Sequence, residues 1–567
     1  IMDWLGKLDM ASSQREWTGE AGDNDWFNKN NWSPKLLPNS NSDVLIQAGS
    51  PIIDNKGQFV RVDKIKIENG AFLTLKSGNV LEVNEDFRND GGEFIIENSY
   101  GENGLSSFLP YGGMSGDVTI RFTIPTNQWF YISTPLREPT KEAIGSEVKS
   151  PYKPYIYSYN TKTKAWVKDP TSIQKAEGNL VYYESESESE IMIEYSGRIN
   201  NGLVPKTVNG KGYYLFGNPY TSPLNWQDGG WELGKVYGTI WYRTRVNKDL
   251  AFVTYNRDAK EGARAALYPD GSKRDDEEEL ALIPPYQSVW IHSKTSTEEN
   301  PFTLEIKPGF QKNNDSAPTL KSSGIVEERP SNIIRIVSDN DISRDGAVIY
   351  FAENMTTSGE DAGDSYKYFN SSANIPEVYT KVGRQALAIN GLPHFEERFE
   401  MPLVVKNRVE SDVTLNFDMS LYRSDDVIVL HDKYLDETIN LRKTNSYKYT
   451  PIVSESEQSD RFVILFNPEN YQDEDDDVST ILDELVNGNN SPNINIVSNG
   501  GHAIVTINKD LLEHGAGRIE VYSIEGKKLS EKEVYSNKTF VVLPQSKGLY
   551  IVVVSAAGER RVVKITN

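Results

Sequence analysis

The sequence predicts an all-β protein built from several domains. Apolar and polar residues alternate over short runs, as in Val118–Ile124, and this period of two is typical of half-buried strands. The 42 Gly and 27 Pro separate these runs, and Phe, Trp and Tyr make up 11% of the residues, which favours many short strands joined by turns. A chain of 567 residues is too long for a single hydrophobic core.

The composition argues against several classes of protein. The formal net charge is −22, and because nucleic-acid binding needs clustered Lys and Arg, we expect no nucleic-acid partner. Cysteine is absent, so disulfides, thiolate zinc sites and cysteine nucleophiles are excluded. No run of about 18 apolar residues occurs, so no membrane-spanning segment is predicted. Ile1 is not an initiator methionine, and we expect a processed chain whose secretion signal has been removed.

Residues 1–124 are predicted to form a loop-rich cap and a short solenoid-like sheet. Aromatic residues in the cap lie among Asn, Gly and Pro, which supply bends. Beyond Val62, apolar pairs at alternate positions recur eight residues apart, with glycines between them. Such pairs fit either stacked solenoid coils or a β-meander. The pairs are Ile65 and Ile67, Leu73 and Leu75, and Leu81 and Val83.

The rest of the chain is predicted to divide into a middle β-domain at 125–310, a linker at 311–330, a β-sandwich at 331–470 and an acidic linker at 471–490. The middle domain has aromatic strands, and the third domain alternates without any long helical period. The first linker is rich in Ser, Asn, Pro and Lys, and the second holds the acidic run Asp473–Asp477.

Residues 491–567 are predicted to form a compact C-terminal sandwich. Gly526 lies between two alternating segments, where a hairpin corner needs positive φ. Leu549–Val554 is apolar at every position, which predicts either that both faces are covered or that one is adhesive. We expect the last strand to offer a free edge that can pair with a strand of a receptor.

This C-terminal region resembles the type A sorting domain of type IX secretion substrates in Bacteroidota. The resembling segments are Ile519–Lys527, Lys547–Val554 and Val563–Ile565, while Ser491-Pro492-Asn493 is followed by Ile494 where the family has a second proline. The resemblance implies an Ig-like sandwich that is recognised by the outer-membrane translocon and its shuttle protein. It also implies an extracellular or cell-surface location. The sorting-signal residues that it implies are Val521, Tyr522, Gly526, Lys527, Gly548, Leu549, Tyr550, Lys564 and Ile565.

The upstream chain resembles the modular surface proteins that such signals terminate, through segments such as Asn31–Pro34, Trp129–Pro135 and Gly217–Tyr220. The resemblance implies a secreted or surface-attached protein that acts in adhesion or structural display, with a host protein or a glycan as possible ligand. Two alternatives stay open. One is a carbohydrate-binding or carbohydrate-processing surface protein, and the other is an accessory subunit of the type IX translocon or gliding machinery.

No pattern in the sequence predicts catalysis. The five histidines form no pair with metal-ligand spacing, and neither a nucleophile elbow nor a phosphate-binding loop is present. With 82 Asp and Glu, carboxylate pairs are inevitable and single out no site. We therefore expect a protein that is not an enzyme, with no catalytic residue, no metal site and no cofactor.

The aromatic residues of the middle domain admit two interpretations. They can form a face that stacks on sugars or binds protein, or they can be half-buried strand residues that only stabilise the sheet. We favour the structural interpretation. The residues concerned are Tyr155, Tyr157, Tyr159, Trp166, Tyr182 and Tyr183.

Overall fold

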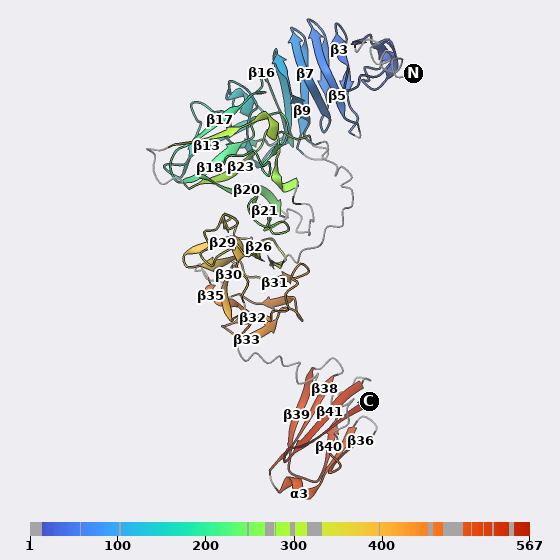
Figure 1. Cartoon of the computed structure of the whole chain (residues 1–567), viewed down its shortest axis with the longest axis vertical. Coiled ribbons are helices and arrows are strands. Elements are labelled where there is room, and N and C mark those ends of the chain that lie inside the picture. The colour runs from blue at the N-terminus through green and yellow to red at the C-terminus, as the bar shows by residue number, and fades with distance from the viewer. Residues whose placement is uncertain are drawn as a thin grey trace. The chain divides into compact units, whose positions relative to one another are not determined.

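A computed structural model gives the fold of the chain (Figure 1), and it confirms the prediction of an all-β, multidomain protein. Two compact units are present, Ile1–Asn467 and Pro468–Asn567, and each is described by itself. The predicted linker at 471–490, and residues 314–330 of the other linker, lie outside the described residues. The structure describes residues 14–56, 58–100, 104–246, 249–266, 277, 279–294, 301–313, 332–395, 397–451, 458–468, 491–499, 502–513, 515–523, 527–543 and 549–566.

The first unit begins with a parallel solenoid, which decides between the two predicted arrangements. Each coil gives one strand to each of two sheets, so successive apolar pairs of the sequence lie alternately in one sheet and the other. Gly70 and Gly78, both at positive φ, make the turns between them. The strands are β3 (Asp43–Ile46), β5 (Val60–Glu68), β7 (Val80–Asp90), β9 (Ser107–Pro110) and β10 (Gly113–Ser115) in one sheet, and β4 (Ile52–Ile53), β6 (Phe72–Leu75), β8 (Glu93–Ser99), β11 (Val118–Pro125) and β16 (Glu190–Gly197) in the other.

The solenoid is capped by a cluster of three tryptophans. Trp32 lies edge-on against Trp17 and Trp26, with ring centroids 5.1 and 4.7 Å away, and its Nε1 donates to the Trp26 carbonyl at 2.9 Å. All three rings are buried. The cap is therefore ordered by burial of large rings. Its elements are β1 (Gln14–Trp17), the 3₁₀ turn η1 (Lys29–Asn31) and β2 (Trp32–Ser33).

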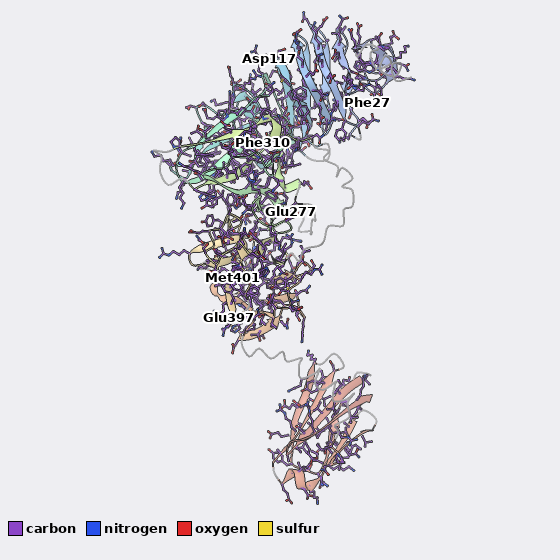
Figure 2. The ribbon with its side chains drawn as sticks, in the orientation of Figure 1. Phe27, Asp117, Glu277, Phe310, Glu397 and Met401 are labelled. Carbon is purple, nitrogen blue, oxygen red and sulfur yellow. The ribbon has the colours of Figure 1, made fainter. Side chains whose placement is uncertain are left out.

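The middle region contains two four-stranded sheets and is fused to the solenoid, since β16 pairs with β11 along its whole length. Its core includes Trp226, Trp231 and Phe310, and Phe310 (labelled in Figure 2) stacks on Trp231 at 4.3 Å. The sheet β12-β15-β13-β14 comprises Trp129–Ile132, Asn179–Glu184, Lys153–Asn160 and Ala165–Lys168. The sheet β18-β23-β20-β21 comprises Gly212–Gly217, Ser288–Ser293, Val236–Val246 and Asp249–Asn256. The remaining elements are β17 (Val204–Val208) with β24 (Phe302–Ile306), β19 (Leu224–Asn225) with β22 (Leu282–Ile283), and the 3₁₀ turns η2 (Glu142–Ile144), η3 (Glu279–Ala281) and η4 (Pro308–Phe310).

The third region is one sheet of 11 strands with one main core. Both ends of the strand path contribute to that core, since Leu430 near one end and Tyr447 near the other belong to the same buried cluster. The order is β33 (Glu437–Asn440), β32 (Ile428–Asp432), β35 (Gln458–Phe466), β30 (Phe399–Lys406), β28 (Glu377–Val382), β29 (Gln385–Leu392), β26 (Arg344–Phe351), β25 (Ile333–Asp339), β31 (Val413–Asp418) and β34 (Ser446–Tyr449), with β27 (Ser365–Tyr366) paired to β29.

The second unit is a small sandwich with its own core between two sheets. Ile494 and Val505 of one sheet pack with Val521 and Val552 of the other. Strands build the described residues of this unit, and the short helix α3 (Lys509–Leu512) lies between β37 and β38. One sheet is β36 (Ile494–Asn499), β37 (His502–Ile507) and β40 (Lys538–Val542), and the other is β39 (Lys528–Val534), β38 (Gly517–Ser523), β41 (Leu549–Ala556) and β42 (Glu559–Thr566).

Candidate functional site

The sorting-signal residues that the structure describes gather on three adjacent strands of the second unit. Tyr522 of β38 pairs with Ile551 of β41, which pairs in turn with Lys564 of β42. Tyr550 and Ile565 form the neighbouring pair. Both faces of β41 are buried, because Val552 belongs to the core and Ile551 lies under Tyr522 on the opposite face. Leu549 opens β41, Lys527 precedes β39, Val521 lies in the core, and Gly526 and Gly548 lie outside the described residues.

The strand edges of this unit differ in chemistry. Edge strand β39 is exposed and carries many charged side chains. Its Lys528 forms ion pairs with Glu520 at 2.8 Å and with Glu531 at 3.2 Å. Charged edge strands resist pairing with other chains. At edge strand β42, the Arg560 carbonyl accepts a hydrogen bond from Ser491 N at 3.1 Å. Among the described residues, no further strand pairs with the outer edge of β42 at Val563–Ile565.

The outer face of the sheet β36-β37-β40 is apolar and exposed. Val497, Ile504 and Phe540 lie in one row across the three strands, and Val542 lies beside them on β40. Val497, Phe540 and Val542 are 49%, 58% and 69% exposed. We call these four residues the apolar outer face. A contiguous exposed patch of this kind on a small domain marks an interaction surface.

The middle region carries a row of aromatic rings on one face of the sheet β12-β15-β13-β14, which we call the aromatic face. Tyr182 lies directly across from both Trp129 and Tyr155, at centroid distances of 4.9 and 6.0 Å. Trp129 is 37% exposed and the other rings are half-buried. The members are Trp129, Tyr131, Tyr155, Tyr157, Tyr159, Trp166 and Tyr182.

The predicted aromatic set was wrong in one member. Tyr183 points to the opposite side of the sheet, where it is fully buried and its hydroxyl donates to the Ile144 carbonyl at 2.5 Å. Adjacent strand residues face opposite sides, so the neighbours Tyr182 and Tyr183 could not share a face. Trp129 and Tyr131, which the predicted set left out, lie on the aromatic face with Tyr182.

One end of the aromatic face is closed by Trp290 of β23, whose ring lies 4.7 Å from Tyr159 and 5.8 Å from Trp166. On its other side Trp290 meets Tyr368 at 5.6 Å. Tyr368 belongs to the third region, so the rings form a continuous seam from the middle region into the third. Ring contacts of this kind add stability beyond the area that they bury.

A cavity of about 330 Å³ opens beside this seam, between the β13–β14 hairpin and strands β17 and β18. Tyr159 and Tyr214 supply its aromatic walls. Glu177 and Lys206 line it as an ion pair at 3.4 Å, with side chains 26% and 11% exposed, and Asn209 lies at its rim. Its volume is within the range of small-molecule sites.

A segment of the third region, residues 362–376, is bonded to the edge of the sheet β18-β23-β20-β21. We call it the arm. Asn256 Nδ2 of β21 donates to the carbonyls of Ala362 and Asp364 at 3.0 and 3.1 Å. Phe252 N of the same strand donates to Asn370 Oδ1 at 2.8 Å. These bonds satisfy groups along an edge strand, so the arm joins the middle and third regions tightly.

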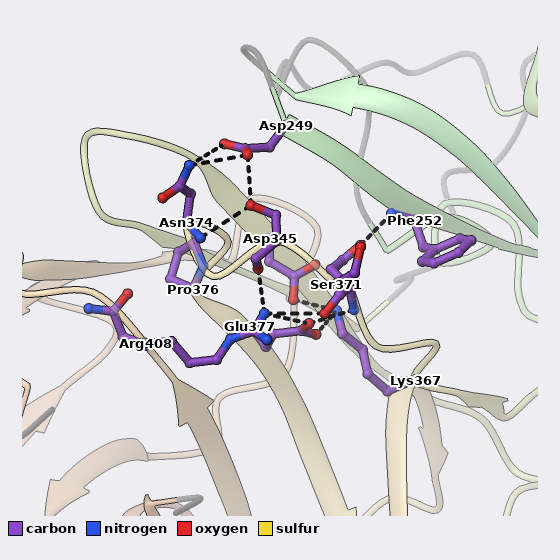
Figure 3. Close-up of polar contacts among 12 residues, drawn as sticks. Asp249, Phe252, Asp345, Lys367, Ser371, Asn374, Pro376, Glu377 and Arg408 are labelled. Carbon is purple, nitrogen blue, oxygen red and sulfur yellow. Dashed lines mark hydrogen bonds and ion pairs between the residues drawn. The ribbon is translucent and has the colours of Figure 1, made fainter. Parts of the chain in front are cut away.

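Buried charged side chains contact the arm and fix its position (Figure 3). Lys367 of the arm donates to the Asp345 carboxylate and lies 3.9 Å from Glu377. Asn370 N donates to Glu377 Oε1 at 2.6 Å, and Arg408 approaches the same oxygen at 3.7 Å. Asp345 and Glu377 are each 1% exposed. We call Asp345, Lys367, Glu377 and Arg408 the charge cluster.

Burial and the neighbouring Asp345 raise the pKa of the Glu377 carboxyl to about 7, while Lys367 and Arg408 oppose the rise. Asp345, Lys367 and Glu377 are closed to solvent, so the cluster positions the arm and its carboxylates offer no space for a substrate. No local spacing in the sequence links Glu377 to Asp345 or Lys367.

Among the described residues, no three His, Asp or Glu side chains gather as a metal site would require. His292 is 7% exposed and lies between the rings of Tyr213 and Tyr237, at 4.4 and 5.2 Å. Burial lowers the pKa of its imidazole to about 4. It is therefore a neutral packing residue. No described helix combines the length and apolar character needed to cross a membrane.

The fold and these surfaces define an all-β modular protein with a separate C-terminal sandwich. Residues 16–466 match the family described as "Domain of unknown function (DUF8693)", and the chain belongs to this family. The match ends within the first unit, one residue before its boundary at Asn467, so the second unit lies outside it.

Other comparisons add little. No curated protein matches the chain. A solved structure titled "Biofilm associated protein - BSP domain" is 8% identical, and the alignment covers 78% of this chain and 96% of that chain. Its TM-score of 0.11 is too low to support any argument from shared fold.

Proposed function

We propose that this is a non-catalytic protein of the cell surface that is exported by type IX secretion. In this proposal the second unit is the export signal, and the first unit acts in adhesion or structural display. The observation that carries the proposal is the independence of the second unit. It has its own core, lies outside the family match, and holds the residues that resemble a sorting domain.

The charge of the second unit supports a separate role. Residues 491–567 hold ten Lys and Arg against seven Asp and Glu, a formal charge of +3, so the preceding 490 residues carry −25. A contrast of this size between two parts of one chain favours different partners. The proposed partner of the second unit is the outer-membrane translocon with its shuttle protein.

Two surfaces of the second unit are suited to that contact. The edge of β42 at Val563–Ile565 can accept a strand, and backbone bonds then give affinity with little demand on sequence. Contact through the apolar outer face would bury Phe540 and Val542, which are 58% and 69% exposed, and so remove apolar surface from water. The charged edge of β39 is the least suited to pairing.

The proposed role of the first unit is adhesion or structural display. Its tight joining through the arm and the charge cluster supports a rigid display body, and the half-exposed aromatic face supports a binding function. The buried carboxylates of the charge cluster are closed to solvent, which supports a structural use of these acids.

Fractionation of Bacteroidota cells that express variants tests the export proposal. Deletion of Val562–Asn567 is expected to leave the protein in the periplasm while the intact chain reaches the surface. The double variant Phe540→Lys, Val542→Lys is expected to reduce surface delivery. Leu529→Lys on β39, which replaces an apolar residue of the other sheet that is 38% exposed, is the control and is expected to be delivered normally. Normal delivery of the tail deletion would refute the proposal.

A further inference from the structure

The cavity beside the β13–β14 hairpin has the chemistry of a binding site. Its lining combines two tyrosine rings with one carboxylate, two lysine ammonium groups (Lys162 and Lys206), hydroxyls and an amide, and Leu215 is its single aliphatic residue. The residues come from segments far apart in the sequence: Tyr159 and Thr161, Glu177, Lys206 and Asn209, and Tyr214. The fold therefore assembles this set of groups in one place.

The lining fits an uncharged, hydroxyl-rich ligand better than other classes. An apolar ligand would leave Glu177 and Lys206 desolvated without new hydrogen bonds, which is costly. A metal cation would find a single carboxylate, which Lys206 already neutralises. An anion would meet the Glu177 charge on the same wall, and of the two lysines Lys206 is already paired with Glu177 while Lys162 is an exposed side chain in contact with solvent. Hydroxyl groups can donate to Glu177 and accept from Lys206 and Asn209 without disturbing that ion pair.

Two features fit a sugar ring in particular. Tyrosine presents an apolar ring face with a polar tip, which suits a ligand that has apolar faces and a polar rim. The volume of about 330 Å³ is at the lower end of the range for ligand pockets, so it suits one or two sugar residues. Tyr157 and Tyr155 continue from Tyr159 along the same face of β13, so further rings are available to the next residues of a chain.

We infer that this cavity binds a neutral sugar residue of a glycan, with Tyr159 and Tyr214 as walls and with Glu177, Lys206 and Asn209 as hydrogen-bonding partners. The inference supplies a ligand class for the proposed surface function. It does not depend on the export route, because the binding is a property of the purified chain.

Saturation-transfer NMR and calorimetry on the full chain test the inference, with glucose, galactose, N-acetylglucosamine and glucuronic acid as probes. We expect at least one neutral sugar to bind. We expect Glu177→Gln and Asn209→Ala each to weaken that binding at least tenfold, since each removes a partner but little volume. Glu232→Gln, which alters an exposed ion pair with Lys307 elsewhere in the middle region, is the control and should bind normally.

Three results would overturn the inference: no binding of any neutral sugar, equal binding by the cavity variants and the control, or preference for glucuronic acid over every neutral sugar. Thermal unfolding of each variant, unchanged from the parent, shows that a loss of binding is local. Loss of sugar binding with normal surface delivery, or the reverse, separates this inference from the export proposal.

Discussion

Removal of the Lys367 ammonium group is expected to be among the most destabilising single changes in the first unit. Lys367→Met keeps the length of the side chain but leaves Asp345 without its nearest cation and removes one of two neighbouring cations from Glu377, and both carboxylates are 1% exposed. Breaking a buried ion pair by removing one partner costs about 3–5 kcal/mol. We expect the free energy of unfolding to fall by about that amount at pH 7.5, because the two buried carboxyl groups lose an ammonium group that lies within ion-pair distance of both.

Tryptophan fluorescence in a urea titration suits this test, since all ten tryptophans lie in the first unit. Trp241 donates to the Tyr366 carbonyl at 3.1 Å, so release of the arm also changes its environment. Arg408→Met is the matched variant: Arg408 lies farther from its carboxylate and is more exposed, so a smaller loss is expected. A loss below about 1 kcal/mol for Lys367→Met would refute the view that the charge cluster holds the arm.

Three further predictions concern the same arm and the second unit. The pKa of Glu377 is raised from its ordinary 4.5 to about 7, so its contribution to stability is complete below pH 4.5 and is lost as the pH rises through 7. The variant Glu377→Gln should therefore show a smaller loss of stability over this pH range. An unchanged pH profile of the urea midpoint would contradict this prediction. Tyr368→Ala should lower the free energy of unfolding by about 2–4 kcal/mol, because the Tyr368 ring lies 4.3 Å from Phe252 and 5.6 Å from Trp290. It should also shift the emission of Trp290 to the red. An unshifted spectrum would contradict the packing of Tyr368 against Trp290. Phe540→Lys should lower binding of a hydrophobic dye without loss of stability, and unchanged dye binding would show that the apolar outer face is not exposed.

Much of the fold could be predicted from the period and spacing of apolar residues and glycines in the sequence. The pairs beginning at Ile65, Leu73 and Leu81 predicted a solenoid or a meander, since glycine turns at fixed intervals need strands of equal length. The spacing alone could not choose between them, because parallel and antiparallel stacking place the same residues inside. Pairing of Val60 with Leu81 in parallel settles the choice.

The candidate site was less predictable from the sequence than the fold, because it depends on contacts between segments that are distant in the chain. Strand alternation could have placed Tyr182 and Tyr183 on opposite faces. No such rule joins Glu177 to Lys206, or Lys367 to Asp345, since those pairs arise only when separate strands pack together. The arm was missed for the same reason: Tyr368 and Asn370 both contact Phe252, which is more than a hundred residues away in the chain.

The central claim, that the second unit is by itself an address for export, is tested most directly by transplanting it. Residues 491–567 fused to a periplasmic reporter, followed by surface protease digestion of intact Bacteroidota cells, should yield a reporter that is cleaved at the surface. The same fusion lacking Val562–Asn567 should stay protected. A complete fusion that folds but remains protected in the periplasm would contradict the account.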